Sequence, residues 1–175
     1  HPDTTIDHYP QACATCGTTI LFGGRSDGVF FRAQSSALGQ FLFYPPSVFN
    51  YFPPDHVIAG TEVTSPEFAI LNTSTAFARA NAATALVLAP AVAPDPTVYG
   101  ATGTALDFAV WQAVAADPGA LATRLDRELL AGRMPPAMRS AIVAAVQALP
   151  SAAAQERART AAWLVVTSPL YQVER

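Results

Sequence analysis

The sequence predicts a mainly α-helical protein, in which an irregular bundle of about five helices follows a largely non-helical N-terminal third. Residues 1–64 are rich in proline, glycine and aromatic residues and show no sustained helical or strand periodicity. Residues 65–175 instead carry apolar residues at helical spacing, separated by residues that typically start and stop helices. We expect the two regions to form one globular domain, because 175 residues can bury a sizeable core.

The first predicted helix begins at Ser65-Pro66-Glu67. A hydroxyl side chain can cap the helix there, proline suits the first turn, and a carboxylate faces the positive end of the helix dipole. This helix is expected to end near Leu88, before Pro90, because proline stops a helix at the residues that precede it. A proline-rich connector follows over residues 90–103.

The second and third predicted helices are bounded by residues of the same kinds. Thr104 is expected to cap the second helix, with Asp107 three residues later as in a capping box. Asp117-Pro118 ends that helix and starts the third, which Gly132 is expected to end. Both helices should bury one stripe, because their apolar residues recur every three or four positions: Leu106, Val110, Trp111, Val114, Leu121, Leu125 and Leu129.

The last two predicted helices lie between prolines. Pro135-Pro136 starts the fourth helix, which Pro150 stops. Ser151 is expected to cap the fifth, which ends before Ser168-Pro169. Short links between five helices predict a bundle.

The composition excludes several classes of protein. Charged residues make up 13% of the chain, about half the usual share, and hydrophobic residues make up 51%, which argues against intrinsic disorder. A net charge of -3, with arginine as the basic residue throughout, disfavours a dedicated nucleic-acid binder, which needs a clustered basic surface. No apolar run is long enough to span a membrane.

The N-terminal segment holds a candidate metal site, formed by His1, His8, Cys13 and Cys16. Two imidazoles and two thiolates are a chemically sensible tetrahedral zinc set. The alternative is a Cys13–Cys16 disulfide or a pair of free thiols, with solvated histidines. If His1 is a mature terminus, its amine and imidazole could instead chelate copper together with His8 or His56.

Six aromatic residues crowd into residues 41–52, around Pro45-Pro46 and before Pro53-Pro54. The prolines impose extended or turn structure, so these rings cannot share one helical stripe. Stacked on the helices they would cover a core. Partly exposed, they would form a platform for sugar rings or an apolar polymer, because ring faces offer a large contact area at low entropic cost. The aromatic residues are Phe41, Phe43, Tyr44, Phe49, Tyr51 and Phe52.

Polar residues beside the aromatic ones are candidates for hydrolytic chemistry. Asp55, His56 and Glu67 are the candidate catalytic residues, and Asp55 with Glu67 could form the paired carboxylates of a glycosidase. Ser47 supplies the serine of a Ser/His/Asp set, but it lacks the glycines of a nucleophile elbow. The candidate ligand-binding residues are Tyr44, Asn50, Tyr51, Phe52, Asn72 and Arg79.

Asn72 and Arg79 are seven residues apart, which places both on one face of a helix. On an alanine-rich face they are expected to tie the aromatic segment to the bundle through charge-assisted hydrogen bonds. The alternative is a ligand site.

Three ordered blocks carry a family resemblance. The first is residues 38–55 (LGQFLFYPPSVFNYFPPD), the second is residues 65–68 (SPEF) with Asn72-Thr73 and residues 78–81 (ARAN), and the third is residues 164–175 (LVVTSPLYQVER). Together they resemble the C-terminal portion of the bacterial family catalogued as domain of unknown function DUF1800, from about Ser35 to Arg175. The resemblance implies a helical, exported protein that is usually much longer and is often encoded beside a second uncharacterised exported protein. It implies no reaction.

We therefore expect an exported bacterial protein of unknown function, secreted or periplasmic, whose helical region has a structural or binding role. Its partner would be another protein or an N-terminal region outside this sequence. The first alternative is a secreted hydrolase that acts on a polysaccharide or ester polymer through the aromatic segment. The second is a small metal-binding protein that uses the N-terminal histidines and cysteines with zinc or copper; otherwise no cofactor is expected.

Overall fold

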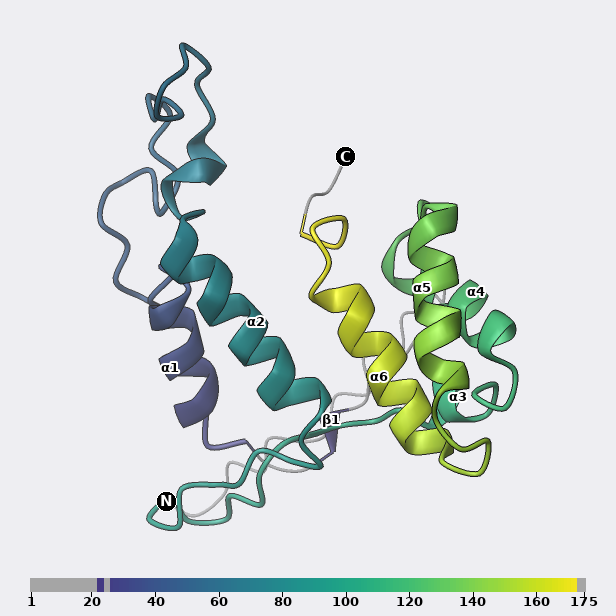
Figure 1. The fold of residues 1–175 in the computed structure, drawn as a ribbon. Coiled ribbons are helices and arrows are strands. Elements are labelled where there is room, and N and C mark those ends of the chain that lie inside the picture. The colour runs from purple at the N-terminus through teal and green to yellow at the C-terminus, as the bar shows by residue number, and fades with distance from the viewer. Residues whose placement is uncertain (1–21, 24–25, 173–175) are drawn as a thin grey trace.

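The computed structural model describes residues 22–23 and 26–172, and its six α-helices in these residues confirm the predicted mainly helical class (Figure 1). A short 3-10 helix precedes α2, and two short strands, β1 (Phe22–Gly23) and β2 (Ala105–Leu106), pair antiparallel. The helices are α1 (Val29–Ala37), α2 (Thr73–Val87), α3 (Ala109–Gln112), α4 (Pro118–Leu129), α5 (Pro136–Gln147) and α6 (Ala154–Val166).

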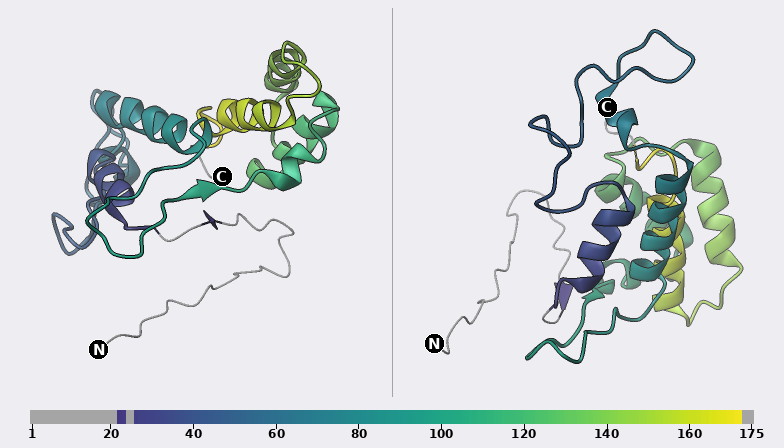
Figure 2. Two further views of the ribbon diagram at one scale, coloured as in Figure 1. Left: turned by 90° about the horizontal axis from the view of Figure 1, so that it is seen from below. Right: turned by 90° about the vertical axis from the view of Figure 1, so that its left-hand side faces the viewer.

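The helices form a bundle that α6 holds together. α4, α5 and α6 pack on one another, and α3 packs against α4 and α6. α2 lies against α6, and α1 lies against α2 on the side away from the rest of the bundle (Figures 1 and 2). In the described residues, no helix has the length and apolar character needed to cross a membrane.

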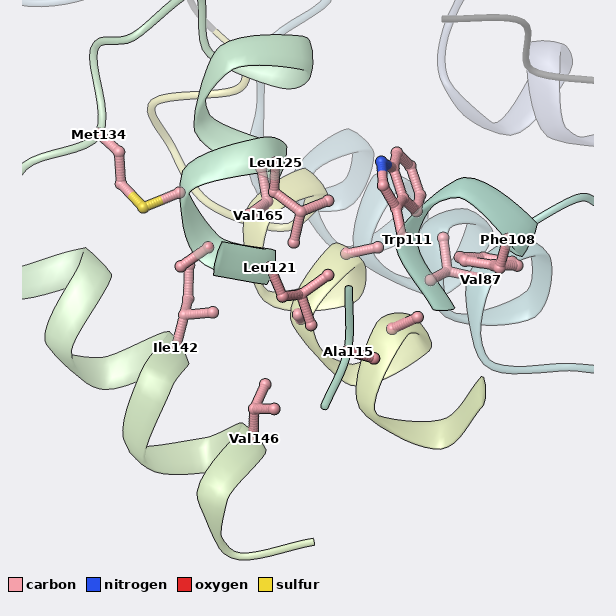
Figure 3. Close-up of a cluster of buried hydrophobic side chains, with 14 of the residues drawn as sticks. Val87, Phe108, Trp111, Ala115, Leu121, Leu125, Met134, Ile142, Val146 and Val165 are labelled. Atoms are coloured by element: carbon pink, nitrogen blue, oxygen red, sulfur yellow. The ribbon is translucent and has the colours of Figure 1, made fainter. Parts of the chain in front are cut away.

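The hydrophobic core lies among α2 to α6 (Figure 3). Burial of each large apolar side chain contributes about 1.5–3 kcal/mol to folding. On α6, small side chains at Ala158, Ala161 and Ala162 are buried and let the neighbouring helices approach closely. The largest fully buried side chains are Leu121, Leu125, Leu130, Ile142, Val146 and Val165.

Arg159 is a buried cation that caps the C-terminal end of α2. Its Nη1 donates to the carbonyl oxygens of Val87 at 2.7 Å and Ala89 at 2.5 Å. Its guanidinium carbon lies 4.7 Å from the centre of the Phe108 ring, a cation–π geometry. The last carbonyls of a helix have no partner within the helix, so Arg159 satisfies α2 while it fixes α2 to α6.

Arg157 has the same role at other helix ends. Its guanidinium donates to the carbonyl of Leu149, just after α5, at 2.7 Å from Nη2. Its Nη1 donates to the carbonyl of Ala115, after α3, at 3.1 Å. Arg157 and Arg159, two residues apart on α6, thus bind the ends of three other helices.

The predicted start of the first helix, at Ser65-Pro66-Glu67, is wrong. Residues 66–69 form only a 3-10 turn, in which the Ser65 hydroxyl donates to Glu67 Oε2 instead of capping the helix. α2 begins later because Asn72 and Thr75 form a reciprocal capping box: Asn72 Oδ1 accepts from the Thr75 N–H, and Thr75 Oγ1 accepts from the Asn72 N–H.

Two other predicted caps are also wrong. Thr104 forms a β-bridge with Val92, so its backbone is committed to an extended pair, and α3 starts only at Ala109. Ser151 lies in a turn, and α6 begins three residues later at Ala154 with no side-chain cap. By contrast, the predicted start at Pro118 is confirmed, since Asp117 accepts hydrogen bonds from the first turn of α4.

The connector between α2 and α3 is anchored by carboxylates. The Asp95 N–H donates to Asp27 Oδ2, next to the start of α1. The side-chain hydrogen bond from Thr97, followed by its backbone hydrogen bond, lowers the pKa of Asp95.

Candidate functional site

The segment between α1 and α2 forms a loop that projects from the molecule, and we call residues 38–72 the projecting loop. It extends past the N-terminal end of α2, away from α3, α4 and α5 (Figures 1 and 2). No residue of this fully described segment belongs to the hydrophobic core cluster. The aromatic residues of the loop therefore do not cover the core of the bundle.

Two tight turns form part of the projecting loop, over residues 41–44 and 47–50. In each turn the last N–H donates to the first carbonyl at 3.1 Å. The central residues are Leu42 and Phe43 in the first turn and Val48 and Phe49 in the second, and all four are exposed. Phe43 is 94% exposed and Val48 is 95% exposed. Turn centres usually hold glycine, proline, asparagine or aspartate, so two pairs of large apolar side chains are unusual there.

The loop holds the first turn in a strained conformation. Phe43 has a φ of 64°, in the left-handed region, which costs a non-glycine residue roughly 1–2 kcal/mol. Behind it, the rings of Phe41 and Tyr44 stack with centroids 5.0 Å apart, and the Tyr51 hydroxyl donates to the Phe41 carbonyl. Backbone strain that the surroundings enforce is typical of sites that bind or react.

A hollow of about 370 Å³ lies behind the two turns. Tyr44 and Tyr51, two of the predicted ligand-binding residues, line it together with Phe41 and Ile70. The other three predicted residues of the loop, Asn50, Phe52 and Asn72, lie outside this hollow. Asn50 closes the second turn with a φ of 62°, and Phe52 is exposed.

Of the predicted catalytic residues, His56 and Glu67 share Ser65 as a neighbour. The Ser65 N–H donates to the His56 carbonyl at 2.9 Å, and the Ser65 hydroxyl donates to Glu67 Oε2 at 3.1 Å. Asp55 is exposed beside His56. Within the part of the chain that the structure describes, no hydrogen bond or ion pair joins the three side chains. Their catalytic role stays a prediction.

Asn72 and Arg79 lie in different surroundings. Asn72 caps α2, whereas Arg79 Nη1 donates to Gln172 Oε1 at 2.8 Å. Arg79 thus ties α2 to the C-terminal segment and not to the aromatic residues.

The predicted metal ligands His1, His8, Cys13 and Cys16 lie outside the described residues. Among the residues that are described, no three or more His, Cys, Asp or Glu side chains gather in a way that could hold a metal ion.

A second hollow of about 390 Å³ lies between α2, α6 and the segment that leads into α3, and we call it the interhelix cleft. Sequence reasoning found Arg79 but missed the apolar wall beside it. The available signal was the spacing of small and apolar residues along α2. Ala82 and Ala83 face the cleft about one turn after Arg79, and Leu86 faces it about two turns after Arg79. The other apolar lining residues are Val87, Leu106, Phe108, Trp111, Leu129, Ala162 and Val166.

The protein is a helical bundle whose projecting loop presents two exposed apolar turns, and these turns form its candidate binding surface. The sequence matches the family described as Protein of unknown function (DUF1800) over residues 20–173, and the chain belongs to that family. The match begins at residue 20, before the first of the sequence blocks that indicated it. No curated protein and no solved structure shows a significant match.

Proposed function

We propose that this chain is the helical, protein-binding region of an exported bacterial protein, and that it binds its partner through the two apolar turns of the projecting loop. The observation that carries the proposal is the exposure of Leu42, Phe43, Val48 and Phe49 at turn centres. Folding gains nothing from apolar side chains that stay in water, so their presence at these positions is explained by contact with another molecule.

The chemistry of the loop favours a protein over a sugar polymer as the partner. Five of the ten exposed large hydrophobic residues of the loop are aliphatic, including Val57 and Val63. Sugar platforms rely on ring faces, whereas protein interfaces bury mixed aliphatic and aromatic anchors.

The charge of the loop further indicates what kind of protein surface the partner presents. Between residues 33 and 78 the sequence has no arginine or lysine and holds three carboxylates, Asp55, Glu62 and Glu67. All three residues are exposed. The complementary surface is an apolar groove with a basic rim, because opposite charges steer association and exclude wrong partners.

Site-specific photo-crosslinking in the bacterium that encodes the chain tests this function. A photoreactive phenylalanine analogue is placed at Phe43 or at Val48, and the cell envelope and medium are separated from the cytoplasm after irradiation. We expect one crosslinked partner in the exported fraction from both positions. Tyr99 is the matched control, because it is also exposed but lies in the connector at the other end of α2.

A second part of the experiment tests whether the three carboxylates of the loop attract the partner. Changing Asp55→Asn, Glu62→Gln and Glu67→Gln together should lower the crosslinking yield, and added salt should lower the yield of the unaltered loop, since both weaken charge attraction. Equal crosslinking from Tyr99, a product formed only between copies of this chain, or a yield indifferent to both charge and salt would each contradict the proposal.

A further inference from the structure

The interhelix cleft is a separate surface from the projecting loop. α2 and α6 are held together by Arg159 at the end of α2 and by a hydrogen bond of 2.9 Å from Trp163 Nε1 to Thr84 Oγ1. Nearer the start of α2 the two helices diverge (Figure 1), and a hydrogen bond from Arg79 to Gln172 spans the gap. The space between these contacts is the cleft.

The wall of the cleft is almost entirely apolar. Leu86 and Val87 from α2 face Ala162 and Val166 from α6. Trp111 also lines it, and the close-up of the core shows Trp111, Phe108 and Val87 grouped together (Figure 3). A volume of about 390 Å³ lies within the usual range for small-molecule sites, which are mostly apolar with a few placed polar groups.

Arg79 is the cation of the cleft, and its charge is not balanced within the described part of the chain. Ion pairs there involve Arg124, Arg127 and Arg139, but not Arg79. The partner of Arg79 is the neutral amide of Gln172, which uses one N–H of a guanidinium that has five. The remaining donors can bind a carboxylate in the two-bond geometry that arginine favours.

Asp107 also lines the cleft but does not neutralise Arg79. Its Oδ1 accepts the Ala109 N–H at 2.8 Å and so starts α3. Asp107 precedes Phe108, which packs with Val87 in the core, and Val87 lies roughly two helical turns from Arg79 along α2. The positive and negative groups are thus at different ends of the cleft.

We propose that the interhelix cleft binds an unbranched medium-chain carboxylate. Its alkyl chain lies between α2 and α6 against Leu86, Trp111 and Val166, and its carboxylate pairs with Arg79. The apolar wall accepts the chain without directional contacts, and the single cation at one end sets the orientation. This site is independent of the partner-binding role of the projecting loop.

Trp111 makes the site directly measurable. The chain has two tryptophans, and Trp111 lines the cleft whereas Trp163 does not, so a ligand in the cleft should change the emission of Trp111. Trp163 is kept, because its hydrogen bond to Thr84 helps to hold α2 against α6. We would titrate this protein with decanoate and, separately, with 1-decanol, both below their aggregation limits, and follow tryptophan emission. Decanoate should give a saturable change, and it should bind at least about tenfold more tightly than the alcohol, which is about 1.4 kcal/mol.

Variants of the chain then test where the carboxylate and the alkyl chain of the ligand bind. Arg79→Gln should weaken decanoate binding at least about tenfold and leave 1-decanol unchanged. Arg79→Lys keeps the charge but loses the two-bond geometry, so its affinity for decanoate should lie between those of the unaltered chain and Arg79→Gln. Arg32→Gln is the matched control, because Arg32 lies on α1 and outside the cleft. Ala83→Phe fills the cleft and should abolish the binding of both ligands; Ala83→Met serves if the phenylalanine variant does not fold by circular dichroism.

The absence of any saturable change with decanoate would overturn the proposal. Equal affinities for decanoate and 1-decanol, or unchanged decanoate binding by Arg79→Gln, would overturn the assignment of a carboxylate. Because the projecting loop is unaltered in all these variants, failure here leaves the crosslinking test of the proposed function unaffected, and the reverse also holds.

Discussion

At the scale of single residues, Arg159 is a buried charge with no counter-charge among the residues that the structure describes. It is stable there because carbonyl dipoles at the end of α2 and the face of Phe108 replace water around the guanidinium. Arg159→Met keeps the length of the side chain but leaves those carbonyls without a donor. We expect the free energy of unfolding to fall by about 1.5–3 kcal/mol, measured by urea titration.

Arg127→Met is the control for Arg159→Met. The Arg127 side chain is 73% exposed and its ion pair with Glu128 is long, at 3.4 Å, so its removal should change stability by no more than about 0.5 kcal/mol. Equal losses in the two variants would show that Arg159 acts only as a general charge and not as a helix cap.

The role of Arg159 could not be predicted from the sequence, and the reason is physical. From the sequence alone, Arg157 and Arg159 would be placed on the solvent-facing side of a helix, because arginine is rarely buried without a partner. Their partners, such as the Val87 and Leu149 carbonyls, are backbone groups, which every residue carries. Arg79 was predicted as a candidate because it interrupts an alanine-rich stretch, but its partner Gln172 is 93 residues away.

At the scale of one element, the start of α2 rests on the capping box of Asn72 and Thr75. Asn72→Ala should lower the free energy of unfolding by about 1 kcal/mol, because the Thr75 N–H loses its acceptor. Asn72→Asp should retain the stability, since a carboxylate accepts the same bond and favours the positive end of the helix dipole. Thermal or urea unfolding followed by circular dichroism measures both.

Asn81 is the matched control within the same helix. It is an exposed asparagine in the interior of α2, where alanine is the better helix former, so Asn81→Ala should leave the stability unchanged or raise it slightly. If Asn72→Ala behaved like Asn81→Ala, the capping role would be refuted and the ligand-binding hypothesis for Asn72 would gain support.

The same element shows what local sequence signals can and cannot decide. The Ser65-Pro66-Glu67 pattern predicted the start of a helix that reaches Leu88, but it starts only a 3-10 turn that ends at residue 69. Asn72 with Thr75 is a capping box whose second member is a hydroxyl and not the usual glutamate, so it was easily missed. At Asp117-Pro118 no competing cap is present nearby, and the predicted start is confirmed.

At the scale of the whole molecule, burial divides the chain into a stable bundle and a weakly held periphery. α4, α5 and α6 share the fully buried core residues, such as Leu125, Ile142 and Val165. α1 has no buried residue and packs mainly on α2, and the projecting loop exposes most of its apolar side chains. The sequence predicted two unlike regions within one globular domain, because the aromatic and proline-rich residues precede the alanine-rich helices. It did not predict α1, which lies in the largely non-helical third, and it did not show that the rings face solvent.

Native-state hydrogen exchange tests this division. Amides of α1 should exchange through local opening, at a free energy at least about 3 kcal/mol below that of amides in α4, α5 and α6, which should exchange only through global unfolding. Low urea should therefore speed exchange in the three bundle helices and hardly affect α1, because local opening exposes little new surface. The C-terminal half of α2 should follow the bundle, since Val87 is buried in the core and its carbonyl is bound by Arg159. Equal opening free energies for α1 and α5 would mean that the chain unfolds as a single cooperative unit, and the loop would then be as firmly held as the bundle.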